Sequence, residues 1–475
     1  NRSECRAAVE SAHRLMLGGN ENPHERWKFA EEKRRRDVDR DHPRWRGKNP
    51  ELAGFIEAYE AELRRRDLID FDDMPLLALR IIREHEWVRR SLRAKFPVLF
   101  VDEYQDLGHA LHELVLLLCF NVGVRLFAVG DPDQSIYSFL GANPKLLENL
   151  SSRAEVRSIR LRFNYRCGTS IIHASMAALG EERDYCCPDD AEAGTIEFHG
   201  IKGELNAQAD FVFASLLPSI RKCGTTMEQI GVLYRWATQG DEVAAKAMEY
   251  GIPIVRADNN ALIKRSSRLS RFVEACANWV AGGWKEANPP FRRLAADAAT
   301  LVLGPGATKE EQLQIQAQLI CFLRSTIGCN MSTHEWLSAF RREALLPWRK
   351  RARTIVEDWD AIDLMIERTD PTKEAGNHLP LSHFGGRIEG SGRLNLSTLH
   401  SAKGREFDAV ILFAMNRDVI PNSFERRSEA QLREARRQFY VGVTRARRHL
   451  YLVCNRESYS PFVAELYRRT QQPYT

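Results

Sequence analysis

The sequence predicts an α/β fold built from parallel sheets, and two observations support this class. Short apolar runs recur along the chain, among them VLFV (98–101), VRLFAVG (124–130) and DAVILF (408–413). Segments with helical spacing lie between several of these runs. Continuous apolar strands that alternate with helices indicate parallel sheets covered on both faces. The 475 residues are enough for about two to four domains, each with its own core.

The composition is that of an ordinary globular protein with a mild excess of positive charge. Hydrophobic residues make up 44% of the chain and charged residues 28%, and the formal net charge is +5. This charge suits a polyanion partner, but it equally suits a solvated surface. The 10 cysteines form no CxxC pair, which indicates reduced thiols in a cytoplasmic protein without a zinc site. The apolar runs are far shorter than the ~20 residues of a membrane helix, so no membrane is expected.

The chain is predicted to begin with helices over residues 1–73. Within this segment Leu52 and Phe55 begin an apolar series at helical spacing. A further helix is expected over 74–92. The charge-dense stretch 24–48 leaves three possibilities open: a surface helix, a loop or a disordered segment.

Two sheet domains and a second helical segment complete the predicted organisation. Residues 74–150 form the first sheet domain, and 151–258 with 391–475 form the second. Strand signals fade over 259–390, where five of the 9 tryptophans lie, so this segment is predicted to be helical. Its aromatic side chains are expected to form a core rather than a base-stacking surface. Further strands are predicted at 156–161, 230–235, 393–399 and 449–454.

The stretch VLFVDEYQD (98–106) places acidic side chains at the end of a buried strand. Ligands of parallel α/β folds bind at the carboxyl ends of strands. Asp102 and Glu103 stand at such an end, where one acid can bind Mg²⁺ and the next can activate a water. The same letters also fit a strand end with solvated acids, and the stretch by itself leaves both interpretations open.

The stretch VRLFAVGDPDQSIYSFLGA (124–142) repeats this arrangement with an amide. Gln134 suits a γ-phosphate sensor, because an amide can hydrogen-bond a phosphate oxygen and a water at once. Tyr137 and Phe139 follow in a loop-like setting. They could stack on unpaired bases, at ~1–3 kcal/mol per base, or they could belong to the core.

Three more stretches contain candidate nucleotide contacts. In LRFNYRC (161–167), Tyr165 and Arg166 offer a ring for a base and a guanidinium for a phosphate. His400 lies in a turn of LSTLHSAKGREF, where a structural role fits as well. In QFYVGVTRA, a helix delivers Arg445 into a turn, from which it could reach a phosphate as an arginine finger or lie on a solvated basic face.

Taken in order, the five stretches resemble the motifs of the UvrD/Rep/PcrA-type superfamily 1A DNA helicases. DEYQD resembles that family's Walker B motif, GDPDQSIYSFLGA its third motif, NYR its fourth, TLHSAKGREF its fifth and QFYVGVTRA its sixth. The similarity covers residues 50–255 and 390–455. It implies two RecA-like parallel-sheet core domains, the first truncated, with helical insertions at 1–73 and 259–390.

The resemblance implies a role in ATP hydrolysis for five residues. Asp102 would bind Mg²⁺, and Glu103 would activate the attacking water. Gln134 would sense the γ-phosphate and link it to DNA. Arg166 and Arg445 would contact the γ-phosphate from the second core domain, across a cleft that binds ATP.

The remaining candidates take roles in nucleotide and DNA binding. The resemblance implies that Tyr165 stacks on adenine and that Glu406 binds the ribose. Tyr137 and Phe139 would meet single-stranded DNA, and His400 would lie near the path that couples DNA to ATP. The whole would be an ATP- and Mg²⁺-dependent helicase that moves 3′→5′ on single-stranded DNA and at single-strand/double-strand junctions, as in DNA repair.

Two departures from the family pattern stand out. Ser138 and Leu140 replace a Gly and an Arg of the third motif, which puts one DNA or coupling contact in doubt. The Walker A loop GxxxxGK[ST] does not occur in the sequence. We expect a chain truncated upstream, which alone hydrolyses almost no ATP. The alternative is a non-catalytic DNA-binding or regulatory relative that has lost the loop. A metal-dependent nuclease is disfavoured, because further acids at suitable spacing are missing.

Overall fold

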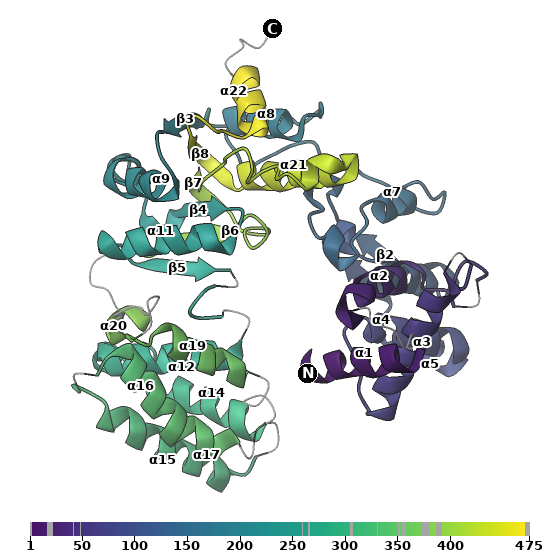
Figure 1. The fold of residues 1–475 in the computed structure, drawn as a ribbon, viewed down its shortest axis with the longest axis horizontal. Helices are drawn as coiled ribbons and strands as arrows, with labels where there is room; N and C mark the ends of the chain where they lie inside the picture. The colour runs from purple at the N-terminus through teal and green to yellow at the C-terminus, as the bar shows by residue number, and fades with distance from the viewer. Residues whose placement is uncertain are drawn as a thin grey trace. The chain divides into compact units, whose positions relative to one another are not determined.

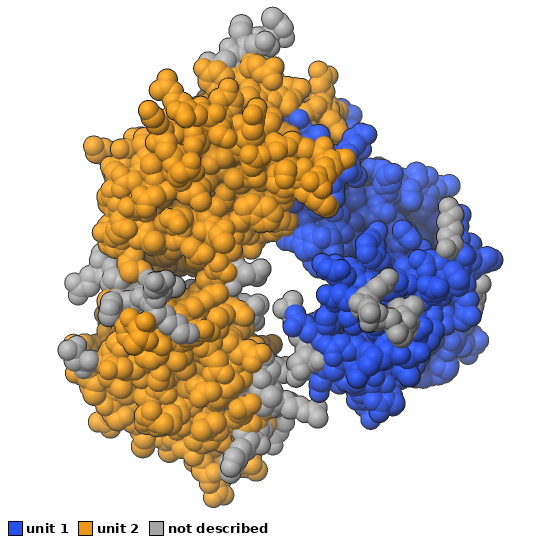
Figure 2. Space-filling view, in the orientation of Figure 1, with its two compact units in different colours: residues 1–162, 428–438 blue, residues 163–427, 439–475 orange. Residues whose placement is uncertain are grey.

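The computed structural model divides the chain into two compact units, which Figure 2 colours separately. Unit 1 comprises residues 1–162 and 428–438, and unit 2 comprises 163–427 and 439–475. The α/β class with parallel sheets is as predicted. None of the described helices is both long and apolar enough to cross a membrane. The structure describes residues 2–16, 22–40, 42–47, 49–258, 260–264, 267–304, 307–329, 331–349, 352, 358–372, 380–385 and 392–470.

Unit 1 begins with a helical subdomain (Figure 1). Its core contains Phe55 and Ile56, both fully buried, and Trp45, which is nearly so. The stretch 24–48, left open from the sequence, is largely a helix followed by a turn. The subdomain and the segment after it contain α1 (Arg2–Met16), α2 (Pro23–Arg36), α3 (Pro50–Arg65), α4 (Asp73–Glu84) and α5 (Glu86–Lys95).

The prediction of a single helix over 74–92 is wrong, because the helix is interrupted at His85, between α4 and α5. His85 lies between them with extended backbone (φ −114°, ψ 105°). Its N–H still donates to Ile81 O at 3.0 Å, so it ends α4 and starts α5. The apolar spacing of this stretch does not reveal the break, since both helices carry apolar side chains.

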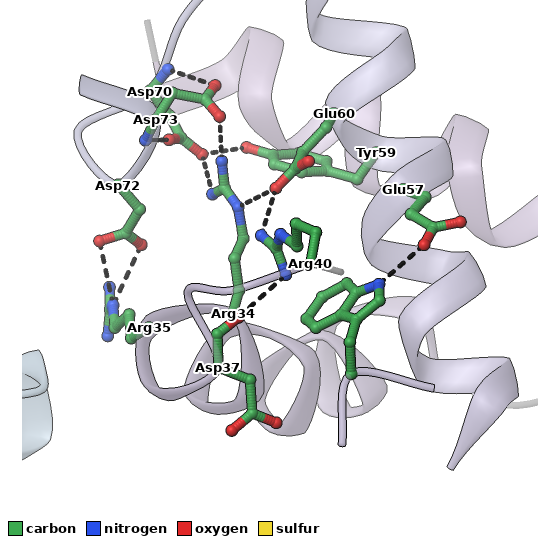
Figure 3. A network of polar contacts seen from close by, with 11 residues as sticks. Arg34, Arg35, Asp37, Arg40, Glu57, Tyr59, Glu60, Asp70, Asp72 and Asp73 are labelled. Atoms are coloured by element: carbon green, nitrogen blue, oxygen red, sulfur yellow. Dashed lines mark hydrogen bonds and ion pairs between the residues drawn. The ribbon is translucent and has the colours of Figure 1, made fainter. Parts of the chain in front are cut away.

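A buried arginine joins α2 to the loop before α4 (Figure 3). The Arg34 guanidinium is fully buried and binds Glu60 Oε1 at 2.9 Å and Asp70 Oδ2 at 2.7 Å. It also pairs with Asp73, and the Tyr59 hydroxyl donates to Asp70 Oδ2 at 2.8 Å. Burial alone would lower the pKa of Arg34, but the hydrogen bond to Asp70 and the surrounding carboxylates raise it. The loop that leads into the sheet is therefore fixed to the helical subdomain.

Two parallel strands, β1 (Val98–Val101) and β2 (Arg125–Ala128), follow in unit 1. One face of this pair packs against Tyr104, Val115 and Leu150, from the loop after β1, from α6 (His109–Leu116) and from α7 (Lys145–Ser151). The other face carries Phe100 and Phe127, which are 72% and 57% exposed. Because the strands are parallel and in register, the loops that follow them leave the same edge of the sheet.

Unit 2 contains a six-stranded parallel sheet in the order β3-β8-β7-β4-β6-β5. Every residue of β4 is buried, as expected for a central strand covered on both faces. The strand predicted at 156–161 is wrong, since this described stretch forms no ladder and Ile159 and Leu161 are exposed. The strands are β3 (Thr195–Ile201), β4 (Ile230–Tyr234), β5 (Ile254–Ala257), β6 (Leu394–Thr398), β7 (Phe407–Leu412) and β8 (Ala446–Asn455).

Helices connect these strands, and one of them is shared between the units. The first part of α21 (Glu429–Val443), up to residue 438, belongs to unit 1, and its last part, from residue 439, belongs to unit 2. Between other strands lie α9 (Leu205–Phe211), α10 (Leu217–Lys222) and α11 (Ala237–Glu249), while α8 (Thr169–Leu179) precedes β3 and α22 (Pro461–Thr470) follows β8.

The described part of the 259–390 segment is helical, as predicted. Trp279, Trp336, Trp348 and Trp359 belong to its core. Trp284 does not, because it lies on a three-residue helix and is 42% exposed. Residues 373–379 and 386–391 lie outside the described part of the chain. The helices are α12 (Arg268–Asn278), α13 (Trp284–Glu286), α14 (Phe291–Leu303), α15 (Lys309–Ser325), α16 (Thr333–Phe340), α17 (Leu346–Arg349), α19 (Trp359–Arg368) and α20 (Leu381–Phe384).

Candidate functional site

The loop after β1 presents two exposed carboxylates, Asp102 and Glu103. Glu103 adopts a left-handed backbone (φ 52°, ψ 43°), which is uncommon for a residue other than glycine. Its N–H donates to Asp102 Oδ1 at 2.9 Å. The next residue, Tyr104, is fully buried, and its N–H donates to Val129 O at 2.9 Å. The turn therefore directs the acids outward while the tyrosine anchors the loop.

Gln105 connects the loop after β1 to the loop after β2. It is fully buried, its carboxamide oxygen accepts the Asp131 N–H at 2.8 Å, and its NH₂ group donates to the Glu103 carboxylate. Gln134 Nε2 donates to Asp131 Oδ2 at 2.8 Å. A Cβ at Gly130 would lie 2.6 Å from Gln105 Oε1, so only glycine leaves room for the carboxamide. Two predicted site residues, Glu103 and Gln134, thus belong to one network in unit 1.

Gln105 is not among the site residues predicted from the sequence, although a signal was present. An amide in the acidic stretch that follows a strand can donate and accept at the same time. In the structure, Gln105 donates to Glu103 in one loop and accepts from Asp131 in the other.

The loop that contains Tyr137 and Phe139 forms hydrogen bonds with side chains of two helices, α2 and α21. Phe139 is 62% exposed, Tyr137 is partly buried, and their ring centroids lie 6.1 Å apart. Burial raises the pKa of the Tyr137 hydroxyl. Arg35 Nη1 of α2 donates to Phe139 O at 3.4 Å, and the Ser138 N–H donates to Glu434 Oε1 at 3.3 Å. Stacking of Tyr137 and Phe139 on DNA bases stays a prediction.

In unit 2, Arg166 and Glu406 form an ion pair that also includes Arg447. The hydrogen bond from Arg447, reinforced by the charge of Arg166, lowers the pKa of Glu406. Next to this cluster Tyr165 is 80% exposed and stacks on Phe163, with centroids 5.9 Å apart and ring planes 24° from parallel. The structure therefore places Arg166, Glu406 and Arg447 in one ionic cluster, and Tyr165 precedes Arg166 in the chain. The roles of Tyr165, Arg166 and Glu406 in nucleotide binding stay predictions.

Two further predicted residues lie deeper in unit 2. Arg445 is buried, and its guanidinium donates to Val441 O and Arg405 O, each at 3.1 Å. Its contact with a phosphate stays a prediction. His400 lies partly buried in the turn after β6, where its carbonyl accepts the Lys403 N–H at 3.2 Å. Its place near DNA likewise stays a prediction.

A magnesium ion can be matched to the donors of unit 1. Among the described residues, no group of three or more His, Cys, Asp or Glu side chains could bind a metal by itself. Mg²⁺ in nucleotide sites retains several waters and binds one or two carboxylates together with the substrate phosphates. The exposed carboxylate of Asp102 fits this requirement as a single protein ligand.

Comparison with known proteins gives consistent matches at both ends of the chain. The UvrD/REP helicase N-terminal domain matches residues 22–155, which include Asp102, Glu103 and Gln134. The UvrD-like helicase C-terminal domain matches 383–457, which include Glu406 and Arg445.

Curated relatives match most of the chain at low identity. ATP-dependent DNA helicase PcrA of Leuconostoc citreum is 25% identical over 475 residues, covering 88% of this chain and 61% of the relative. ATP-dependent DNA helicase Rep of Escherichia coli K12 is 26% identical over 463 residues, covering 85% and 67%. PcrA of Staphylococcus aureus MRSA252 is 24% identical over 446 residues, covering 84% and 60%. The chain thus spans about three fifths to two thirds of the length of these relatives. Both helicase domain models match and their motifs lie in the two units, so the comparisons support a UvrD-type helicase of superfamily 1A.

Proposed function

We propose that the chain is the motor part of an ATP-dependent DNA helicase that moves 3′→5′ along single-stranded DNA. The observation that carries this proposal is the pair of loops after β1 and β2, in which Gln105 joins Glu103 to the loop of Gln134. Such loops, at the carboxyl ends of parallel strands, are where α/β folds bind their ligands. The matched relatives are named as ATP-dependent DNA helicases.

In this proposal unit 1 supplies the hydrolytic groups. Asp102 would bind the Mg²⁺ that accompanies ATP, and this ion would supply positive charge to the phosphates. Glu103 accepts a proton from the attacking water, a role typically worth about 10²–10⁴ in rate. Gln134 hydrogen-bonds the γ-phosphate through its amide.

Unit 2 supplies nucleotide contacts. The Tyr165 ring, supported from behind by Phe163, offers a flat and exposed surface on which adenine can stack. Glu406 accepts a hydrogen bond from the ribose. Arg166 and Arg445 contact the γ-phosphate, which requires each guanidinium to exchange its present partners for phosphate oxygens.

Single-stranded DNA, alone or at a junction with duplex, is the proposed track. Phe139 and Tyr137 stack on unpaired bases, at about 1–3 kcal/mol per base. His400 lies near the DNA in this proposal. Leu140, in place of the family's arginine, leaves this track with one charged contact fewer.

Turnover in this proposal also needs a phosphate-binding loop. The 475 residues contain no GxxxxGK[ST] segment, whose backbone N–H groups and lysine bind the phosphates of such enzymes. We therefore expect the chain by itself to hydrolyse ATP hardly at all. The same observation favours one alternative, a non-catalytic DNA-binding relative.

The test joins the chain to the phosphate-loop segment of a matched relative and measures DNA-stimulated ATP hydrolysis. Arg445→Ala should lower kcat by about 10³–10⁵, because an arginine finger stabilises the charge of the transition state. Arg448→Ala is the matched control, since its exposed guanidinium pairs with Glu192 at 2.9 Å. Parental turnover in Arg445→Ala would remove the finger assignment. A silent parent that still binds single-stranded DNA would favour the non-catalytic relative.

A further inference from the structure

We propose that Gln105 is a positioning residue that orients Glu103 for water activation and couples it to the loop of Gln134. This inference rests on the proposed ATP hydrolysis. Both ends of the Gln105 carboxamide are used: the oxygen accepts from Asp131 N–H at 2.8 Å, and the NH₂ group donates to Glu103. The side chain is fully buried, so the carboxamide itself has no solvent-exposed surface.

The chemistry of the position requires an amide. The group at residue 105 must accept a hydrogen bond from a backbone N–H and donate one to a carboxylate at the same time. An ionised glutamate of the same shape could accept but not donate, and it would place a second negative charge beside Glu103. Gly130 makes the arrangement possible, because any side chain there would displace the carboxamide.

The contacts also provide a route between the two loops. Asp131 receives hydrogen bonds from the Asp133 N–H at 3.0 Å and from Gln134 Nε2 at 2.8 Å. The Ser135 hydroxyl donates to the Gln105 carbonyl at 3.2 Å, so the loop after β2 contacts Gln105 at two points. A movement of Gln134 toward a phosphate would therefore shift Asp131, and Asp131 would shift Glu103 through the buried Gln105 side chain.

The first experiment is Gln105→Glu in the chain joined to a phosphate-loop segment. We expect kcat at neutral pH to fall about 10²-fold or more, the typical share of a general base, with the KM for ATP nearly unchanged. Lowering the pH should restore part of the loss, because a protonated Glu at 105 regains a donor. The matched control is Gln229→Glu, whose exposed side chain accepts hydrogen bonds from Thr226 and does so equally well as a carboxylate.

A second variant tests the same contact from the other side. Gly130→Ala should reduce kcat in the same direction, since its Cβ would displace the carboxamide oxygen. Unchanged thermal unfolding of Gln105→Glu would separate this role from a purely structural one. Parental kcat and an unaltered pH profile in Gln105→Glu would overturn the inference.

A readout without ATP keeps the inference apart from the proposed function. In the 475-residue chain labelled with ¹⁵N-glutamine, the Gln105 side-chain amide protons should exchange slowly with solvent and lose protection in Glu103→Ala. Fast exchange in the parent would overturn the inference even if the joined protein hydrolyses ATP. Slow exchange that Glu103→Ala removes, in a joined protein without turnover, would support the contact and reject only the proposed hydrolysis.

Discussion

Some side chains in this protein each satisfy several groups at once. Gln105 is one of them, and Arg34 is another. Arg34 binds three carboxylates from two parts of unit 1, and its guanidinium has no exposed surface. Removing one partner of a buried ionic network is far more damaging than removing a surface pair, because charges are left buried without compensation.

Arg34→Met should therefore lower the local free energy of unfolding of α2 and α3 by about 3–5 kcal/mol. Amide hydrogen exchange of these two helices measures the change within one part of a multidomain chain. Arg36→Met is the matched control, because the Arg36 side chain on the same helix is 59% exposed and pairs with the neighbouring Asp37. The control should change by less than about 0.5 kcal/mol. Equal effects of the two substitutions would contradict the assigned importance of the buried network.

Two helices of the 259–390 segment, α15 and α16, begin at short capping sequences. Thr308 precedes α15, its hydroxyl accepts the Glu311 N–H at 3.3 Å, and Glu311 Oε2 accepts the Thr308 N–H at 2.9 Å. Ser332 and Glu335 repeat this reciprocal arrangement before α16. Such a pair satisfies backbone donors that the first turn of a helix leaves without partners.

Thr308→Ala should destabilise α15 by about 1 kcal/mol, since alanine cannot accept the capping hydrogen bond. Hydrogen exchange of the first turn of α15 reports this loss directly. Thr300→Ala is the control, because Thr300 lies inside α14 and its hydroxyl only donates to Ala296 O at 2.9 Å. Alanine is the better helix former there, so that variant should keep or slightly raise stability. A larger loss in Thr300→Ala than in Thr308→Ala would contradict the capping role.

The elements that the sequence predicts well are those with strong local patterns. The buried strands β4 and β7 appear as apolar runs, and the 259–390 segment appears as helical through its fading strand signals and its tryptophans. β3 and β5 were missed because they lie at the edges of the sheet, where the side chains are at most partly buried. The site shows the same division. Motif letters locate Glu103 and Arg166, whereas the partners Gln105 and Arg447 follow only from contacts that form in the folded chain.

At the scale of the whole molecule, charge is the property that bears on the proposed DNA track. The formal net charge is +5, contributed by 69 Lys and Arg against 64 Asp and Glu. This excess is small, so affinity for a nucleic acid depends on where the cations gather rather than on the total. Release of counterions from DNA would then make binding sensitive to salt.

Binding of a fluorescent single-stranded oligonucleotide, measured by anisotropy, should weaken linearly with salt on a log–log plot. Each phosphate that is neutralised should contribute about −0.7 to the slope. An abasic oligonucleotide of equal length is the control, since it retains the charges but lacks the bases. It should keep the slope and lose affinity through missing stacking, at about 1–3 kcal/mol per base. A flat salt response would argue against a nucleic-acid ligand.

The strand order of unit 2 has a consequence for how the protein is made. A ribosome releases β3, β4 and β5 first, yet no two of these three are neighbours in the finished sheet. Their partners β6, β7 and β8 begin only at Leu394, more than one hundred residues after β5 ends at Ala257. At about 5–20 residues per second, the nascent chain therefore carries three unpaired strands for several seconds or longer. During that interval chaperones and proteases compete for them, and premature termination before β6 leaves a product that cannot assemble its sheet.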